Sequence, residues 1–82
     1  MRAEDARQTL RQMVRQRPFQ QFLISLENGD RMLIEHPENL AFDPTDNGKT
    51  RFSVVTQNIV CYATLESVAS VIHQDTGSVV GV

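Results

Sequence analysis

Residues 16–38 read QRPFQQFLISLENGDRMLIEHPE and contain the most regular pattern of the chain. One set of alternate positions on either side of the Asn28-Gly29 dipeptide is apolar throughout. These positions are Phe22, Ile24, Leu26, Met32 and Ile34. A period of two is typical of strands, and an Asn-Gly step between two such runs is typical of a hairpin turn. The stretch therefore predicts two antiparallel strands.

The register of this hairpin follows from keeping its apolar side chains on one face. A two-residue turn would place Leu26 opposite Arg31 and mix charge into the apolar face. A three-residue loop over 27–29, with its glycine in a left-handed conformation, places Ile24 opposite Met32 instead. We predict the second register because it produces one continuous apolar face.

The preceding segment, about residues 3–17, has the period of an amphipathic helix. Its apolar side chains recur at three- and four-residue steps and are Ala3, Ala6, Leu10, Met13 and Val14. Glu4 and Asp5 stand at its start, where the helix dipole favours acids. Pro18 ends it, because the residue before a proline is pushed out of helical geometry.

The two parts of the chain differ in charge. Residues 1–17 carry five arginines against two acids, whereas the rest of the chain has a net charge of −5. We therefore expect the two parts to form different surfaces or to bind different partners.

Beyond the first hairpin, a proline and a polar loop divide the chain. The segment His36-Pro37-Glu38 ends the second strand, because proline cannot donate to a central ladder. Residues 43–49 are rich in Asp, Pro, Asn and Gly, which predicts a mobile loop. Residues 51–56 and 59–64 read as strands with only Gln57-Asn58 between them, which predicts a second tight hairpin.

Residues 64–73 fit two patterns. Leu65, Val68 and Ile72 recur at helical spacing, whereas the β-branched Val68, Val71 and Ile72 favour a strand. We predict a single tight turn over 65–67 followed by a fifth strand. We expect residues 74–82, with two glycines, to form a flexible tail.

Length and composition predict one domain over residues 1–82. A chain of 82 residues that is 40% hydrophobic is close to the lower limit for burying its own core, so self-association is expected. The single cysteine, Cys61, stands among apolar neighbours and is expected to be a buried, inert thiol in a reducing cytoplasm. No segment has the length and apolarity of a membrane span or a signal peptide. We therefore expect a cytoplasmic protein without a membrane contact.

The expected architecture is mainly β, with an N-terminal α-helix and a small antiparallel barrel of five strands over about residues 19–73. This order resembles the SH3-like barrel of the Sm-like proteins, the fold of bacterial Hfq and the Sm proteins. The motifs that carry the resemblance are ISLENGDRMLIE, ENLAF and VCYATLESVASVI. The chain is similar also to a set of small uncharacterised bacterial proteins with an RPFxPFxIxLxDGxxxxVxHPE signature. That signature is met here by Arg17-Pro18-Phe19, Phe22, Ile24, Leu26, Gly29, Ile34 and His36-Pro37-Glu38.

The resemblance to Sm-like proteins implies RNA binding, but only part of their binding pattern is present. These proteins use an Asp-x-x-x-Asn near the second and third strands and basic residues near the last hairpin. At the last hairpin this chain has Tyr62-Ala63-Thr64. Only Asn39 matches the family's pattern, so the resemblance implies the fold more than the activity.

The best candidate contact surface is a row of three arginines on the predicted helix, Arg7, Arg11 and Arg15. Their spacing of four residues places them on one face. Three guanidinium groups in a row could meet phosphates and add a salt-dependent, sequence-independent affinity. They could equally bind an acidic partner or simply form a solvent-exposed face of the helix.

The remaining polar residues suggest no catalytic or metal chemistry. His36 and His73 lack a second ligand at metal spacing and would have to meet Cys61 or an acid in space. His36 and Glu38 lack a nucleophile or an oxyanion loop beside them, and we expect His36 to end a strand and cap a neighbouring carbonyl. The sequence thus predicts no enzyme activity, no cofactor and no small-molecule substrate.

Two functions follow as hypotheses. The first is a non-enzymatic interaction module that pairs with itself or with another protein, with edges expected at Ser53–Thr56 and Val68–Ile72 because both are β-branched and nearly uncharged. The second is an Sm-like RNA-binding protein that uses Arg7, Arg11 and Arg15, with Asn39. Self-association as a dimer is the simplest form of the first hypothesis.

Overall fold

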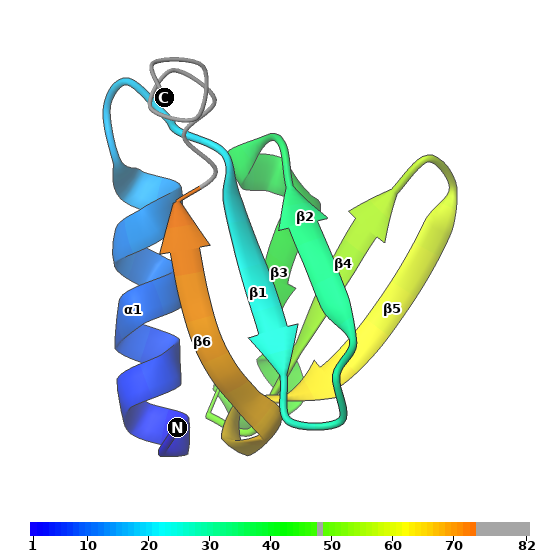
Figure 1. Ribbon diagram of the computed structural model, residues 1–82. Helices are drawn as coiled ribbons and strands as arrows, with labels where there is room; N and C mark the ends of the chain where they lie inside the picture. The colour runs from blue at the N-terminus through cyan, green and yellow to red at the C-terminus, as the bar shows by residue number, and fades with distance from the viewer. Residues whose placement is uncertain (48, 74–82) are drawn as a thin grey trace.

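The structure, a computed structural model, describes residues 1–47 and 49–73 as one helix packed against two antiparallel sheets (Figure 1). The helix α1 spans Ala3–Arg15. The strands are β1 (Phe22–Leu26), β2 (Arg31–Ile34), β3 (Leu40–Phe42), β4 (Arg51–Thr56), β5 (Ile59–Thr64) and β6 (Val68–His73). Short 3₁₀ turns are η1 (Pro37–Asn39), η2 (Pro44–Asp46) and η3 (Leu65–Ser67). The tail predicted for residues 74–82 lies outside the described residues.

The helix is shorter than the sequence predicted. It ends at Arg15 rather than near Arg17, because Gln16 is already extended, with φ −61° and ψ 142°. Pro18 excludes helical geometry at Arg17, and the chain leaves the helix one residue before that.

The strands form a first sheet in the order β2-β1-β6 and a second sheet in the order β3-β4-β5. The predicted five-stranded barrel is not confirmed, since residues 1–47 and 49–73 contain six strands in two separate sheets. The additional strand is β3, which pairs Leu40 with Val54 and Phe42 with Phe52. Three residues are too few for a strand to show a period in the sequence.

The first hairpin has the predicted register. Ile24 lies opposite Met32 and Phe22 opposite Ile34. Gly29 has a φ of +95°, and its N–H donates to the carbonyl of Leu26 at 2.9 Å. The three-residue loop is therefore confirmed.

The second hairpin and the final turn are also confirmed. Thr56 lies opposite Ile59, and the two residues between them have positive φ values of 47° and 70°. This geometry is that of a type I′ turn, the turn that matches the twist of the flanking strands. The tight turn η3 then leads into β6, so residues 68–73 are a strand rather than a helix.

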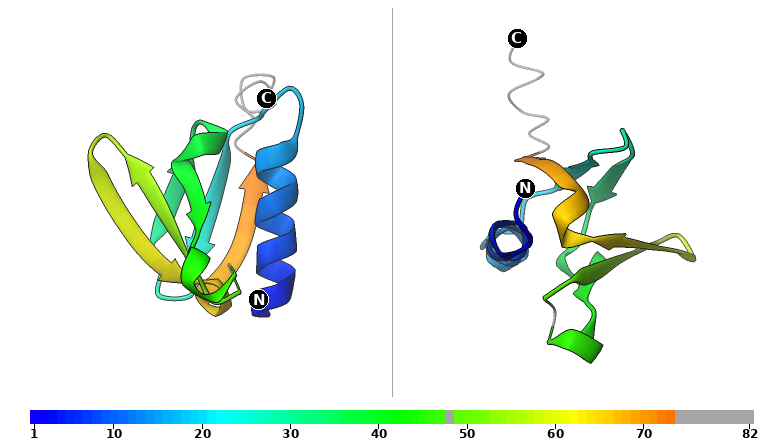
Figure 2. Two further views of the ribbon diagram at one scale, coloured as in Figure 1. Left: turned by 180° about the vertical axis from the view of Figure 1, so that it is seen from behind. Right: turned by 90° about the horizontal axis from the view of Figure 1, so that it is seen from below.

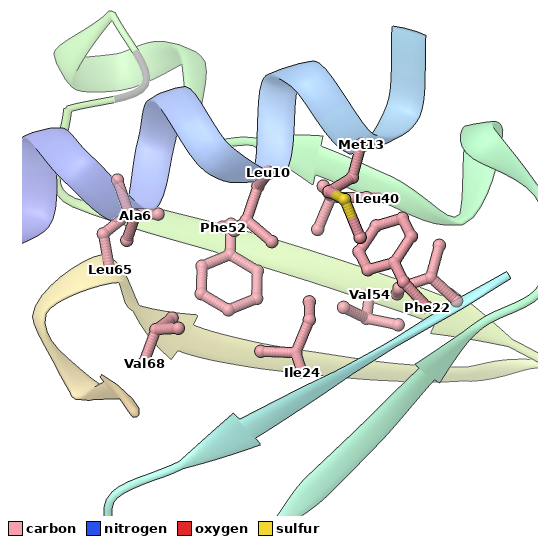
Figure 3. Packing of buried hydrophobic residues seen from close by; sticks show 11 residues of the cluster. Ala6, Leu10, Met13, Phe22, Ile24, Leu40, Phe52, Val54, Leu65 and Val68 are labelled. Carbon is pink, nitrogen blue, oxygen red and sulfur yellow. The ribbon is translucent and has the colours of Figure 1, made fainter. Parts of the chain in front are cut away.

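The core lies between the two sheets and is covered on one side by α1 (Figure 3). The helix contributes Ala6, Leu10 and Met13, and the sheets contribute large side chains that include Phe22, Ile24, Phe52 and Val54. The β4–β5 hairpin extends away from this core, on the side of the molecule opposite α1 (Figures 1 and 2). The fold thus leaves β5, the outer strand of this hairpin, largely uncovered.

Candidate interaction surface

The β4–β5 hairpin exposes large apolar side chains. Ile59 is 60% exposed, Val60 48% and Tyr62 77%, and all three belong to β5. Val60 lies opposite Val55 on β4, which is exposed as well. Residues directly opposite each other share a face of the sheet, so the Val55–Val60 pair forms an outward-facing apolar patch.

The other face of β5 is also uncovered toward its start. Ile59 and Cys61 lie opposite Thr56 and the buried Val54, which places both on the core-facing side. Both are nevertheless exposed. The prediction that Cys61 is a buried thiol is therefore wrong, because Cys61 lies on the edge strand of its sheet, which the core does not cover even beside the buried Val54.

Four of the described strands lie at the edges of the sheets, and three of these edges are protected. The edge strand β2 has four residues and begins with the exposed Arg31, and β3 has only three residues. Short strands and charges are two of the devices by which proteins protect an edge.

The third protected edge is β6, beside which α1 runs (Figure 1). The amino group of Met1 donates to the carbonyl of Val68 at 2.8 Å, at the start of the strand. At its end, Nε2 of His73 lies 2.9 Å from Oε1 of Gln16. A covering helix is a third device that protects an edge.

The remaining edge, β5, has none of these features. It is six residues long, and no residue between 52 and 65 is charged. It lies on the opposite side of the molecule from α1 (Figure 1). Of the two predicted edges, Val68–Ile72 does lie in an edge strand, whereas Ser53–Thr56 does not, because β4 pairs with both β3 and β5.

Two pockets lie on either side of Tyr62. The first has a volume of about 440 Å³, and the second of about 400 Å³. The first is lined by Leu26, Asp30, Arg31, Met32, Cys61 and Tyr62. Leu26 and Met32 are half-buried and apolar, whereas Asp30 and Arg31 are exposed and of opposite charge. The second lies between Tyr62 and the η2 segment, where Phe42 and Asp43 line it.

Asp43 is held in place by its neighbours. Its Oδ1 accepts bonds from the N–H of Thr45 at 2.9 Å and from the hydroxyl of Thr45 at 2.7 Å. Its Oδ2 lies 3.1 Å from a guanidinium nitrogen of Arg51. The bonds from the Thr45 backbone and side chain, and then the charge of Arg51, lower the pKa of Asp43 from its ordinary value of 3.8. The carboxylate thus joins the start of η2 to the first residue of β4.

The three arginines of the predicted row are not equally available. Arg7 is half-buried, and its Nε is buried without a hydrogen-bond partner among the described residues. The guanidinium carbon of Arg11 lies 5.7 Å from the centre of the Phe42 ring, within the range of a cation–π contact. Of the three, only Arg15 is exposed. The row therefore belongs partly to the packing of α1 on the second sheet.

Asn39, the residue matched to the Sm-like pattern, makes internal contacts. Its Oδ1 accepts a bond from the N–H of His36 at 2.9 Å, and its Nδ2 donates to the carbonyl of Val55 at 2.9 Å. It is half-buried at the end of η1. These bonds join η1 to β4.

The two histidines and the cysteine do not form a metal site in the part of the chain that the structure describes. No group of three His, Cys, Asp or Glu side chains in that part could hold a metal ion. His36 is exposed, and its backbone carbonyl accepts a bond from the N–H of Asn39 at 3.0 Å. The side chain of His73 contacts Gln16 instead.

The residues that matter most on this surface, Ile59, Val60 and Tyr62, were not singled out in the sequence. The available signal was the absence of charge from residue 52 to 65. Which strand of the hairpin lies at the edge depends on a partner strand, β3, that the sequence did not reveal.

The chain matches no family model, no curated protein and no solved structure. Among the helices of residues 1–47 and 49–73, none has the length and apolarity needed to cross a membrane.

Proposed function

We propose that this chain is a non-enzymatic interaction module that associates with itself through β5. The observation that carries the proposal is the contrast between β5 and the other three edges. Those edges are short, charged or covered by α1, whereas β5 is long, uncharged and apolar. Such an edge favours the addition of a further strand, because the outward backbone groups of Val60 and Tyr62 have no partner among the described residues and the side chains of β5 carry no repelling charge.

The size of the chain supports the same proposal. A domain of about this length buries only about 60% of the surface of its unfolded chain. Pairing along β5 would cover Ile59, Val60 and Tyr62, which are among its most exposed large apolar residues. Each Å² of apolar surface that is buried contributes about 25 cal/mol of free energy, so covering such side chains stabilises a small domain substantially.

The proposed interface is compatible with an Sm-like barrel that has not closed, so that two of its strands remain at the ends of the strand order. The strands β2 and β3 follow one another through η1, so the order β6-β1-β2 continues along the chain into β3-β4-β5. The ends of this path are β6 and β5. In this arrangement α1 covers one end, and a second copy of the chain covers the other.

The alternative function, RNA binding through Arg7, Arg11, Arg15 and Asn39, has weaker support. Arg11 already contacts Phe42, and the amide of Asn39 is bonded to His36 and Val55. Phosphate contacts would have to compete with these interactions or rely on Arg15.

The proposal is tested by a proline at Val60, with Val60→Thr as the matched control. Proline lacks an amide hydrogen and is tolerated at a sheet edge, so Val60→Pro should fold but lose pairing along β5. Light scattering over a hundredfold concentration range should give a concentration-dependent mass above that of the chain for the wild type and for Val60→Thr. Val60→Pro, with a wild-type circular dichroism spectrum, should remain a monomer. A wild-type protein that stays monomeric up to millimolar concentration would show the proposal to be wrong.

A further inference from the structure

We propose that two copies of the chain join β5 to β5 as an antiparallel pair around a two-fold axis that passes between the two Cys61 residues. This inference rests on the proposed function. It adds the identity of the partner strand, its direction and its register.

The direction of the backbone groups of β5 follows from its turn. A type I′ turn is closed by a hydrogen bond between its flanking residues, here Thr56 and Ile59. Bonded and non-bonded pairs alternate along an antiparallel ladder, so Cys61 and Ala63 also turn their backbone groups toward β4. Val60, Tyr62 and Thr64 then direct theirs to the open edge.

A two-fold axis restricts how two such edges can pair. Outward-directed residues must face outward-directed residues, because only these can exchange hydrogen bonds. The axis therefore passes between two copies of one residue and not between two different residues. An axis at Val60, at Cys61 or at Tyr62 satisfies this condition.

The turn and the end of the strand select among these registers. An axis at Val60 would place Asn58 opposite Tyr62, but Asn58 is a turn residue with a φ of +70°. An axis at Tyr62 would place Ile59 opposite Leu65, which has left the strand and lies in η3. An axis at Cys61 places Val60 opposite Tyr62 and Ile59 opposite Ala63.

The Cys61 register also gives the most favourable side-chain pairs. On the outward face, Tyr62 of each copy meets Val60 of the other, and aromatic–β-branched pairs stabilise sheets. On the core-facing side, the large Ile59 meets the small Ala63. The three exposed large apolar side chains of β5 all gain a partner.

Charge is compatible with this pairing. The absence of charged residues from 52 to 65 removes repulsion between identical strands. Asp30 and Arg31 line the same pocket as Cys61. The charges of Asp30 and Arg31 are opposite, so two copies of this pocket bring no net charge to the pair.

The register is tested by cross-linking the full chain through its own cysteine. In the proposed pair, Cys61 faces Cys61 at a non-hydrogen-bonded position, where Cα atoms are about 4.5 Å apart. This distance falls within the range of about 4.4–6.8 Å that a disulfide spans. Diamide provides the oxidant: the two thiols lose two protons and two electrons, and the diazene takes them up to become a hydrazine.

Two variants serve as controls. Cys61→Ser combined with Tyr62→Cys moves the thiol by one residue and should cross-link only if the axis lies at Tyr62. Cys61→Ser combined with Ile72→Cys places a thiol at an exposed position of β6, where Ile72 is 56% exposed, and reports random collisions. The mass of each reduced variant is measured by light scattering in parallel.

We expect the wild type to be a dimer by mass. We expect diamide to cross-link it at least tenfold faster than either control. If the proteins have the mass of a dimer but the Tyr62→Cys variant cross-links, or the wild type does not cross-link through Cys61, the register is wrong while self-association stands. Masses above a dimer would also overturn it, since a two-fold pair is closed. A reduced wild type that is monomeric throughout would overturn both this inference and the proposed function.

Discussion

The side chain of Asn39 takes the place of a backbone group in the second sheet. The last paired residues of β3 and β4 are Leu40 and Val54. Beyond them, the carbonyl of Val55 accepts a bond from Asn39 Nδ2 instead of from a strand. A residue that the Sm-like resemblance associates with RNA thus has a structural role here.

Removing this amide should destabilise the fold. Asn39→Ala leaves the N–H of His36 and the carbonyl of Val55 without partners, which we expect to cost about 1–3 kcal/mol. Asn39→Asp keeps the acceptor for His36 and should lose less. Urea denaturation of the three proteins measures the difference, and equal stabilities would contradict the structural role.

The position of Gly29 favours glycine because of its backbone conformation and not because of a lack of space. A φ of +95° is unfavourable for side-chain-bearing residues, although no heavy atom lies within 4 Å of where a Cβ would stand. We expect Gly29→Val to lower the free energy of unfolding by about 1 kcal/mol or more. Gly29→Asn should lose less, because asparagine tolerates positive φ better. A Val variant as stable as the wild type in thermal denaturation would argue against this loop conformation.

The elements that the sequence predicted correctly are those specified by local pattern. The β1–β2 register follows from keeping charge off one face, and the β4–β5 turn follows from the two residues left between two strands. The strand β3 was missed because it has three residues and is held by its pairing with β4. Tertiary pairing, rather than local preference, decides such a segment.

The surface was harder to predict than the fold for the same reason. Exposure of Cys61 and the packing of Arg11 on Phe42 depend on where the two sheets lie relative to α1. Apolar neighbours in the sequence suggested burial of Cys61, but they belong to an edge strand that the core does not cover. The charge pattern of α1 can be read from the sequence, whereas the partial burial of its arginines cannot.

The loop between β3 and β4 should respond to acid through Asp43. Because its folded pKa is lowered, its contribution to stability is present above the ordinary value of 3.8 and is lost as the pH falls through the lower folded value. Asp43→Asn should therefore be less stable than the wild type at neutral pH, and the two should converge below the folded pKa. Thermal denaturation between pH 7 and pH 2 measures this, and a constant difference down to pH 2 would contradict it.

The molecule as a whole has a covered side and an open side. The helix α1 protects β6 and contributes Ala6, Leu10 and Met13 to the core, while β5 lies at the opposite side without a cover (Figure 1). The positive charge of α1 therefore lies far from the uncharged edge. We therefore propose that the protein associates through β5 and not through α1.

This assignment predicts weak interaction with nucleic acid. We expect the wild type to show no steeply salt-dependent binding to a single-stranded RNA or DNA oligonucleotide at low salt. Fluorescence anisotropy measures this, with Arg7→Gln, Arg11→Gln and Arg15→Gln combined as the matched variant. Tight binding that the triple variant abolishes would favour the RNA function instead.

Amide hydrogen exchange tests the role of β5 most directly. The N–H groups of Val60 and Tyr62 are expected to face the open edge, so they should exchange rapidly in dilute protein and at least tenfold more slowly at millimolar concentration. The amides of β2, at another sheet edge, should exchange at the same rate at both concentrations. Exchange at Val60 and Tyr62 that does not change with concentration, in samples whose mass shows association, would place the interface elsewhere and contradict the proposed role of β5.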